Sequence, residues 1–438
     1  IDLAHSQGKP FWAAMRFNDA HPGQYGMISR FAADHPEYRL DDRCPAQIHG
    51  PEPDGSIPDC RHLDFSIPEV RDHQLRLIEE LCRKYDVDGF EWDFTRDMGH
   101  NFPRDMAADP ADVTTSHVQE ARTLLNRIGR DRGRKVEFAV RIPATLEACK
   151  EADLDIRQWI GEGLIDMATP TVYYDTTCEL PFDTFVELAR DTDCHIYACV
   201  TEGVGPGRFR PPPIEAVRAG ALNAWRQGVD GINMFNFLHH QHANRPADIA
   251  MLSELGSPAT LARKDKLYMI AGIGVTCQSR FFGMPYPTAY AHQLPAEIHG
   301  DSTGVAVRVP VGDDIEDARQ EHILAAVILT LDLCHVTGEE DLDLRINNTQ
   351  VPFNEGRFDV SSQYPWNWNG QLGHFEVAFD LTWRDCVRQG ENEVTLTLRQ
   401  RPDDIGQSLI LYALRLDIRY RAVPMGVNDS AVGTHSSC

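Results

Sequence analysis

The sequence lacks long hydrophobic runs and is poor in positive charge. None of its 438 residues lies in a stretch that approaches the roughly 18 consecutive apolar residues of a membrane-spanning helix. Lysine and arginine total 42 against 66 aspartates and glutamates, so the formal net charge is −24 at pH 7. This balance repels phosphate backbones and anionic bilayers, which makes nucleic acids and membrane surfaces poor partners. A neutral or cationic ligand suits the chain better.

Cysteine is sparse as well, with 11 residues and no Cys-x-x-Cys pair. An odd number at irregular spacing argues against a disulfide scaffold, and we expect scattered buried thiols. The chain also lacks an initiating methionine and the basic and apolar regions of a signal peptide. Residues 1–8 instead predict the end of a helix that Gly8 stops, so the chain looks truncated at its start. These features do not fix the compartment, and a secreted or periplasmic location is slightly favoured.

Short apolar runs alternate with amphipathic stretches from residue 11 to about residue 250. Strands that are repeatedly separated by helices pair in parallel through βαβ crossovers. A closed barrel of this kind has eight strands in about 250 residues, whereas six are visible here. We therefore predict a (β/α)8 barrel over residues 1–262 that lacks its first two βα units; an open doubly wound sheet is the alternative. The predicted strands are Phe11–Phe17, Val87–Phe94, Val136–Ile142, Ile165–Tyr174, His195–Thr201 and Gly231–Phe237, and the predicted helices include Val70–Tyr85, Ser116–Arg132, Phe182–Asp191 and Pro213–Gly228.

One helix start has a clear local signature. Ser66-Ile-Pro-Glu69 has the spacing of a capping box, in which the serine hydroxyl and the glutamate carboxylate each satisfy a free amide. Proline is tolerated in the first helical turn. The pattern predicts that Ser66 caps the helix.

The hydrophobic rhythm changes after residue 262. Residues 263–295 predict an irregular connector, because glycine and proline interrupt them. Over residues 296–423 apolar side chains recur at every second position, as in Val305, Val307 and Val309. This period without intervening helices is typical of an antiparallel β-sandwich. Residues 424–438 are expected to form a loose tail.

The strongest candidate for chemistry is the strand that contains Glu91 and Asp93. Strand geometry places both carboxyl groups on one face, with Phe90, Trp92 and Phe94 on the other. In a parallel barrel the chemistry sits at the C-terminal strand ends, so Asp93 is expected at the rim and Glu91 one layer below. Unpaired buried carboxylates are costly, which favours a functional site. The alternative is a structural network in which Arg16 or Arg141 pairs these acids.

This region also carries a resemblance to a known family. Pro68-Glu-Val-Arg-Asp72 and Tyr85-Asp-Val-Asp-Gly-Phe-Glu-Trp-Asp93 resemble the family-10-like glycosyl hydrolases, bacterial (β/α)8 proteins in which an aspartate closes a similar strand. The resemblance covers roughly residues 1–260, is strongest over 60–96, and implies a glycoside hydrolase. The chain has Glu-Trp-Asp-Phe where the family often shows a His-Phe-Asp-Asp type. Whether Glu91 or Asp93 leads therefore stays open.

A glycoside hydrolase needs a second carboxylate from another strand. Glu202 ends a predicted strand and precedes a glycine- and proline-rich loop. If two βα units are missing, this pair lies on strands four and seven, which resembles the arrangement of a large clan of retaining glycosidases. That resemblance implies Asp93, or Glu91, as acid/base and Glu202 as nucleophile. Asp175 is the reserve candidate.

Other strand ends supply groups that could bind sugar hydroxyls or stack on sugar rings. For each residue alone, a packing or loop-capping role is as plausible. The candidates are Arg16, Asn18, Asp19, Arg141, Tyr173, Tyr174, Asn233 and Asn236.

Two further patterns carry less weight. His239, His240 and His242 could bind a metal, but no acid or cysteine lies at ligand spacing. Trp366 and Trp368 in the predicted sandwich could stack on a sugar or fill the edge of the sandwich.

From the carboxylate pair and the family resemblance we expect a hydrolase of O-glycosidic bonds that uses no cofactor and acts on a poly- or oligosaccharide. A non-catalytic carbohydrate-binding barrel and a metal-dependent hydrolase or lyase remain the rivals, and the oligomeric state is left open.

Overall fold

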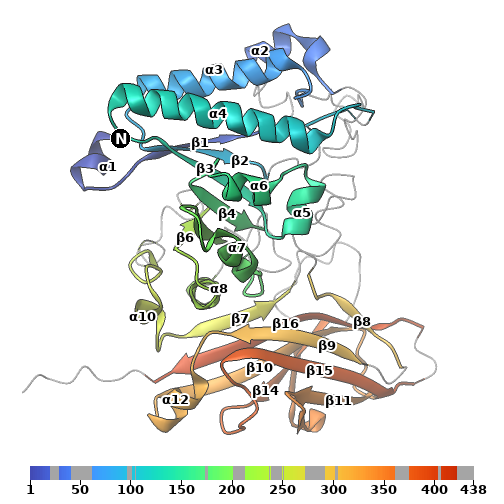
Figure 1. The fold of residues 1–438 in the computed structure, drawn as a ribbon. Helices are drawn as coiled ribbons and strands as arrows, with labels where there is room; N and C mark the ends of the chain where they lie inside the picture. The colour runs from blue at the N-terminus through green and yellow to red at the C-terminus, as the bar shows by residue number, and fades with distance from the viewer. Residues whose placement is uncertain are drawn as a thin grey trace, which may run out of the picture.

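Six parallel strands build the first half of the molecule (Figure 1), and they follow one another in the sheet in chain order. The sheet is curled like half of a barrel, which confirms the predicted parallel strands; eight strands are not shown. The strands are β1 (Trp12–Arg16), β2 (Gly89–Asp93), β3 (Glu137–Pro143), β4 (Met167–Thr171), β5 (His195–Val200) and β6 (Gly231–Met234). The computed structural model describes residues 1–19, 29–40, 62–95, 101–103, 105–172, 176–200, 213–235, 237, 249, 251–271, 292–300, 304–360, 374–402 and 406–421.

The helices of this half cover one face of the sheet. Phe90 and Trp92 of β2 share a buried core with Ile78 and Val118, which lie on the two long helices that run side by side in Figure 1. A doubly wound sheet reverses its strand order at a switch point, whereas the described strands run in chain order from β1 to β6, which argues against that alternative. The helices are α1 (Asp2–Ser6), α2 (Arg30–Asp34), α3 (Pro68–Lys84), α4 (Pro110–Arg132), α5 (Leu146–Glu151), α6 (Ile156–Gly161), α7 (Phe182–Ala189), α8 (Ile214–Arg226) and α10 (Pro258–Leu261), with a 3₁₀ turn η2 at Pro36–Tyr38.

The predicted capping box is wrong. Helix α3 begins at Pro68, so its N-cap position is Ile67 and no side chain caps it. Ser66 lies one residue too early, and its amide donates to the Asp64 carboxylate at 2.8 Å. The predicted stop of the first helix is confirmed, since Gly8 follows α1 with a φ of +66°.

Asp-Gly pairs open two strands in the same way. At β2, Asp88 accepts a hydrogen bond from the Phe11 amide at 2.7 Å, and at β6, Asp230 accepts one from the Ile196 amide at 2.8 Å. The Trp12 ring lies over Gly89 so closely that an added Cβ would meet it at 2.6 Å. Glycine is therefore required there by close packing.

Two antiparallel sheets form the second half, as predicted, and share one buried core. One sheet has the order β13-β14-β10-β16-β7, with β8 also pairing with β16, and the other has the order β12-β11-β15-β9. The elements are β7 (Lys266–Ile270), β8 (Ala296–Ile298), β9 (Val305–Val311), α12 (Ile315–Gln320), β10 (Leu324–Cys334), β11 (Asp341–Ile346), β12 (Thr349–Val351), η3 (Phe353–Glu355), β13 (Arg357–Val360), β14 (His374–Asp380), β15 (Gly390–Gln400) and β16 (Leu409–Tyr420).

The segment expected as an irregular connector contains a strand. β7 lies at its start and pairs antiparallel with β16, with Leu414 opposite Ile270. Lys266 at its first position is fully buried and pairs with Asp313 at 2.8 Å, and Asp313 also accepts hydrogen bonds from Tyr268 and Tyr420 at 2.6 Å. These contacts anchor β7 in the sandwich.

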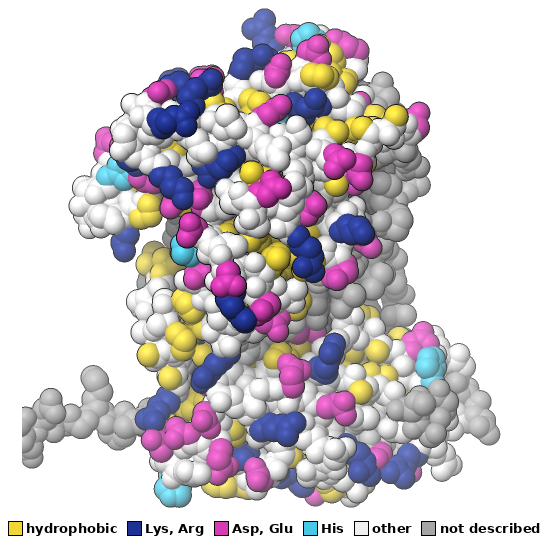
Figure 2. Space-filling model, in the orientation of Figure 1, with side chains coloured by type: hydrophobic (Ala, Val, Ile, Leu, Met, Phe, Trp, Pro, Cys, Tyr) yellow, Lys and Arg dark blue, Asp and Glu magenta, His cyan; other side chains and the backbone are white. Residues whose placement is uncertain are grey.

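Helix α8 joins the two halves. The Asn223 amide donates to the carbonyl of Cys178 in the first half and of Pro310 in the second, both at 2.8 Å. Figure 2 shows acidic and basic side chains interspersed over both halves on this face. Among the described helices, none is long and apolar enough to cross a membrane.

Candidate functional site

The inner face of the curled sheet, which we define as the face not covered by the helices, carries the polar side chains. Ala14, Glu91 and Ala139 are neighbours in one row across β1, β2 and β3. Arg16, Asp93, Arg141 and Thr169 follow in the next row, toward the C-terminal strand ends. Alternation along each strand thus brings Glu91 and Asp93 to one face, as the sequence predicts.

Asp93 is buried and its two carboxylate oxygens are already bonded. Oδ2 accepts a hydrogen bond from Nη1 of Arg141 at 2.9 Å, and both side chains are less than a tenth exposed. Oδ1 accepts hydrogen bonds from the Thr95 amide at 2.9 Å and from its hydroxyl at 2.5 Å. Asp93 therefore takes part in a structural ion pair, which was the alternative to a catalytic role, and its partner is Arg141 and not Arg16.

Glu91 differs from Asp93 in its burial and in its hydrogen bonding. It is partly buried, and its carboxyl group makes no hydrogen bond to any described residue. Burial raises the pKa of Glu91 to about 7; the Arg141 guanidinium lowers it in part, and the Asp93 carboxylate raises it further. A carboxyl group with a pKa near neutrality can both donate and accept a proton under physiological conditions.

Arg141 links the two acids and is itself buried, at 1% exposure. Its guanidinium carbon lies 3.5 Å from the centre of the Phe235 ring, while Nε and Nη2 have no hydrogen-bond partner among the described residues. Burial opposes its charge, but chiefly the Asp93 carboxylate keeps the pKa of Arg141 above its usual range. Cationic Arg141 therefore offsets part of the negative charge of the two carboxyl groups.

Neighbouring inner-face residues were not predicted as part of the site. Cys199 on β5 lies 3.6 Å from the Asn233 side-chain oxygen, and burial raises the pKa of its thiol, so it stays neutral. The hydroxyl of Thr169 is buried and has no hydrogen-bond partner in the described part of the chain. The period-two alternation could have identified both, because they occupy the same face as Arg141.

Three predicted contacts lie at the end of β1. Arg16 is exposed and forms an ion pair with Asp19. The Asn18 amide is bonded to the backbone of Leu63, which it donates to at 2.9 Å and accepts from at 3.0 Å. Asn18 thus fastens the segment before α3 to the sheet, and substrate contacts of these residues stay predictions.

Several predicted residues lie outside the described part of the chain, and their geometry stays untested. The proposed second carboxylate is among them, so its separation from Asp93 is not measured. These residues are Glu202, Tyr173, Tyr174, Asp175, Asn236, His239, His240, His242, Trp366 and Trp368.

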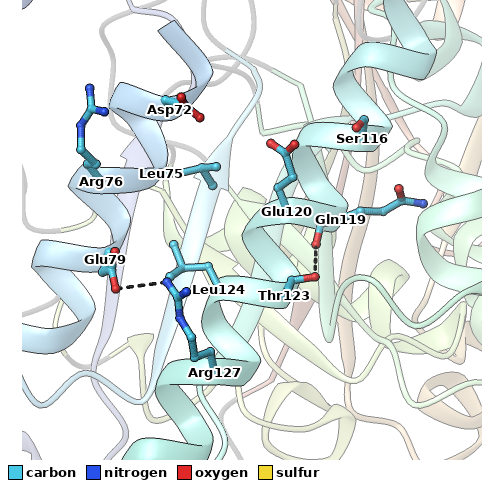
Figure 3. Close-up of a pocket in the computed structure, with 10 residues that line it drawn as sticks. All are labelled: Asp72, Leu75, Arg76, Glu79, Ser116, Gln119, Glu120, Thr123, Leu124 and Arg127. Carbon is cyan, nitrogen blue, oxygen red and sulfur yellow. Dashed lines mark hydrogen bonds and ion pairs between the residues drawn. The ribbon is translucent and has the colours of Figure 1, made fainter. Parts of the chain in front are cut away.

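Figure 3 shows a groove on the opposite, helix-covered side, between α3 and α4. Glu79 on its rim accepts hydrogen bonds from Arg127 at 3.2 Å and from Arg83 at 2.8 Å. Glu79 is thus paired both along α3 and across to α4. Within the described ranges, no group of three or more His, Cys, Asp or Glu could hold a metal ion.

No protein-family model matches the chain, and no curated protein matches it. Solved structures that match the chain include a cycloisomaltooligosaccharide glucanotransferase from Paenibacillus sp., at 10% identity and TM-score 0.31 over 94% of this chain and 46% of that one. A family 18 chitinase from Chromobacterium violaceum matches at 9% identity and TM-score 0.31, over 83% of this chain and 74% of that one. An Anoxybacillus α-amylase matches at 10% identity and TM-score 0.34, over 92% and 78%. The chain spans less than half the length of the glucanotransferase, and at these scores the matches identify no family.

Proposed function

We propose that the protein hydrolyses an O-glycosidic bond in a poly- or oligosaccharide, with Glu91 as the proton donor. The observation that carries the proposal is the state of Glu91 on the inner face, where its carboxyl group is partly buried, unbonded among the described residues and has a pKa of about 7. A general acid that protonates the leaving oxygen must hold its proton near the working pH, and enzymes achieve this by burial and a neighbouring carboxylate. Glu91 has both.

Asp93 is better suited to position Arg141 than to attack the substrate. Both of its oxygens are hydrogen-bonded within the protein, and it is 4% exposed. The second carboxylate would then come from another strand end, and Glu202 remains our candidate for it. A separation of about 5–5.5 Å from Glu91 would imply retention of configuration, and about 6.5–9.5 Å inversion.

The proposal extends to the architecture and the family. Six parallel strands with helices on one face would form most of an eight-stranded barrel, and its C-terminal strand ends would carry the site. The resemblance of the β2 region to family-10-like glycosyl hydrolases supports the same assignment. We place the catalytic unit in residues 1–262 and treat the β-sandwich as an accessory unit.

The test is hydrolysis of a panel of neutral polysaccharides and 4-nitrophenyl glycosides, measured as released reducing ends or nitrophenol. Glu91→Gln should lower kcat by about 10²–10⁴-fold, because the amide cannot donate a carboxyl proton. Glu137→Gln is the matched control, since Glu137 lies on the neighbouring strand, at its N-terminal end. It should leave kcat within about twofold. Equal turnover by Glu91→Gln and the wild-type protein would refute the assignment.

A non-catalytic carbohydrate-binding barrel is the second candidate. The buried Asp93–Arg141 pair favours it, because that contact fixes the inner face without any need for chemistry. Such a protein would bind a glycan of the same panel and release no product with any variant. Binding without turnover by the wild-type protein would therefore select this function.

A further inference from the structure

The β-sandwich contains a pocket where the chain crosses from one sheet to the other. Its volume is about 390 Å³, within the range of about 300–1,000 Å³ that small-ligand sites occupy. The walls come from β11, from the turn before it and from the connection that runs through β12, η3 and β13. No residue of the inner-face site contributes to this pocket.

An aromatic ring is presented at this pocket in a fixed position. Phe358 is 45% exposed despite its size. Its ring packs edge-on against Phe353 at 6.0 Å, and Phe353 packs in turn against the buried Phe379 at 5.4 Å. The exposed face of Phe358 is therefore held in place before any ligand arrives, which reduces the entropy lost on binding.

The lining also carries polar side chains, and two of them have no hydrogen-bond partner among the described residues. The Asn354 amide and the Asp341 carboxylate line the pocket, are exposed, and make no hydrogen bond to the described residues. Gln350 is oriented by donating to Asp343 at 3.0 Å. Glu340 is already used, because it accepts from the Thr337 and Gly338 amides at 3.0 Å and pairs with Arg401.

The charge of the lining excludes one class of ligand. Among the described lining residues there is no lysine or arginine, whereas Glu340 and Asp341 both carry carboxylates. A phosphate, sulfate or uronate would meet repulsion there without a cationic partner. An aromatic face beside amide and carboxylate groups instead matches a pyranose ring, which has one apolar C–H face and an edge of hydroxyl groups.

We propose that this pocket binds a neutral sugar ring of a polysaccharide, with the ring on Phe358 and its hydroxyls bonded to Asn354 and Asp341. The proposal does not depend on catalysis at the inner face. A sandwich with such a site would hold the polymer close to the rest of the protein and so raise its local concentration.

Affinity gel electrophoresis of the full chain tests the proposal, with galactomannan, arabinoxylan, mixed-linkage β-glucan or dextran in the gel. At least one of these neutral polymers should retard the wild-type protein. Phe358→Ala should weaken that retardation about tenfold or more, and Asn354→Ala severalfold. Trp383→Ala is the control: Trp383 is 83% exposed on the same sandwich but lies outside the pocket, so its removal should have no effect.

Each contrary result has a defined meaning. Retardation by none of the four polymers, or equal retardation of Phe358→Ala and the wild-type protein, overturns the pocket. Retardation by polygalacturonate that Phe358→Ala abolishes would overturn the neutral class of ligand. Loss of binding by Phe358→Ala with no hydrolysis by any form would keep the pocket and reject the hydrolase, whereas the opposite pair of results would do the reverse.

Discussion

Glu91 and Asp93 lie two residues apart on one strand, yet their surroundings give them different roles. Asp93 accepts three hydrogen bonds, two of them from Thr95 in the loop that follows β2 and one from Arg141 on β3. Glu91 accepts none from the described residues. Alternation along the strand predicted that both face the same way, but which arginine pairs with which acid depends on the register between strands. A single strand's sequence does not contain that register.

The raised pKa of Glu91 should make stability depend on pH. Because its pKa of about 7 lies above the ordinary 4.5, the folded chain binds more protons than the unfolded chain between these values. The free energy of unfolding should therefore fall as pH rises through this window, by at most about 3 kcal/mol in total for this group and less for its partial exposure.

Glu91→Gln removes this titration and tests the sign. Relative to the wild-type protein, the variant should gain about 1–3 kcal/mol in unfolding free energy between about pH 5 and about pH 8, measured by urea denaturation. Glu137→Gln controls for the loss of one glutamate from the same sheet. A difference between Glu91→Gln and wild type that does not change with pH would contradict the pKa assignment.

At the scale of elements, the sequence predicted all six parallel strands and four of the helices between them. It did not name α5 or α6, and it began α4 at Ser116 instead of Pro110. The predicted cap of α3 was also wrong. The spacing of apolar residues along the chain differs between helices and strands, and this spacing identified the predicted elements. A cap, by contrast, depends on the one residue at which the helix begins. Because α3 begins at Pro68, its cap position is Ile67 and not Ser66. A local motif is thus less secure than a period that extends over many residues.

Helix α4 supplies a real cap for comparison. Asp109 is its N-cap and accepts a hydrogen bond from the Ala111 amide at 3.0 Å. Asp109→Ala should lower the free energy of unfolding by about 1 kcal/mol, whereas Ser66→Ala should change it by less than about 0.5 kcal/mol. Urea titrations of both variants decide the matter. An equal loss in both would mean that Ser66 caps α3 after all.

At the scale of the whole molecule, the sequence predicted a parallel sheet followed by antiparallel sheets. The predicted start of the antiparallel part, at residue 296, was too late, because β7 already belongs to it. β7 was expected to be irregular, yet it pairs with β16, whose residues lie about 150 positions later in the chain. The sequence of a short apolar run does not identify which strand it pairs with when that strand is so distant in the chain. The contact between the halves could not be predicted either, because it joins residues that are far apart in the sequence.

Gly312 lies against helix α8 and offers a sharp test of the contact between the halves. A Cβ at this position would meet the Leu222 side chain at 2.8 Å and the Asn223 side-chain oxygen at 2.9 Å. Asn223 is the residue that bonds both halves, so a methyl group there would push α8 away from the sandwich. Gly312→Ala should therefore lower the free energy of unfolding by about 1–3 kcal/mol, measured by urea denaturation.

Gly256→Ala, where no atom lies within 4 Å of the added Cβ, is the control. If the two variants unfold at the same urea concentration, the halves do not depend on this contact for their stability.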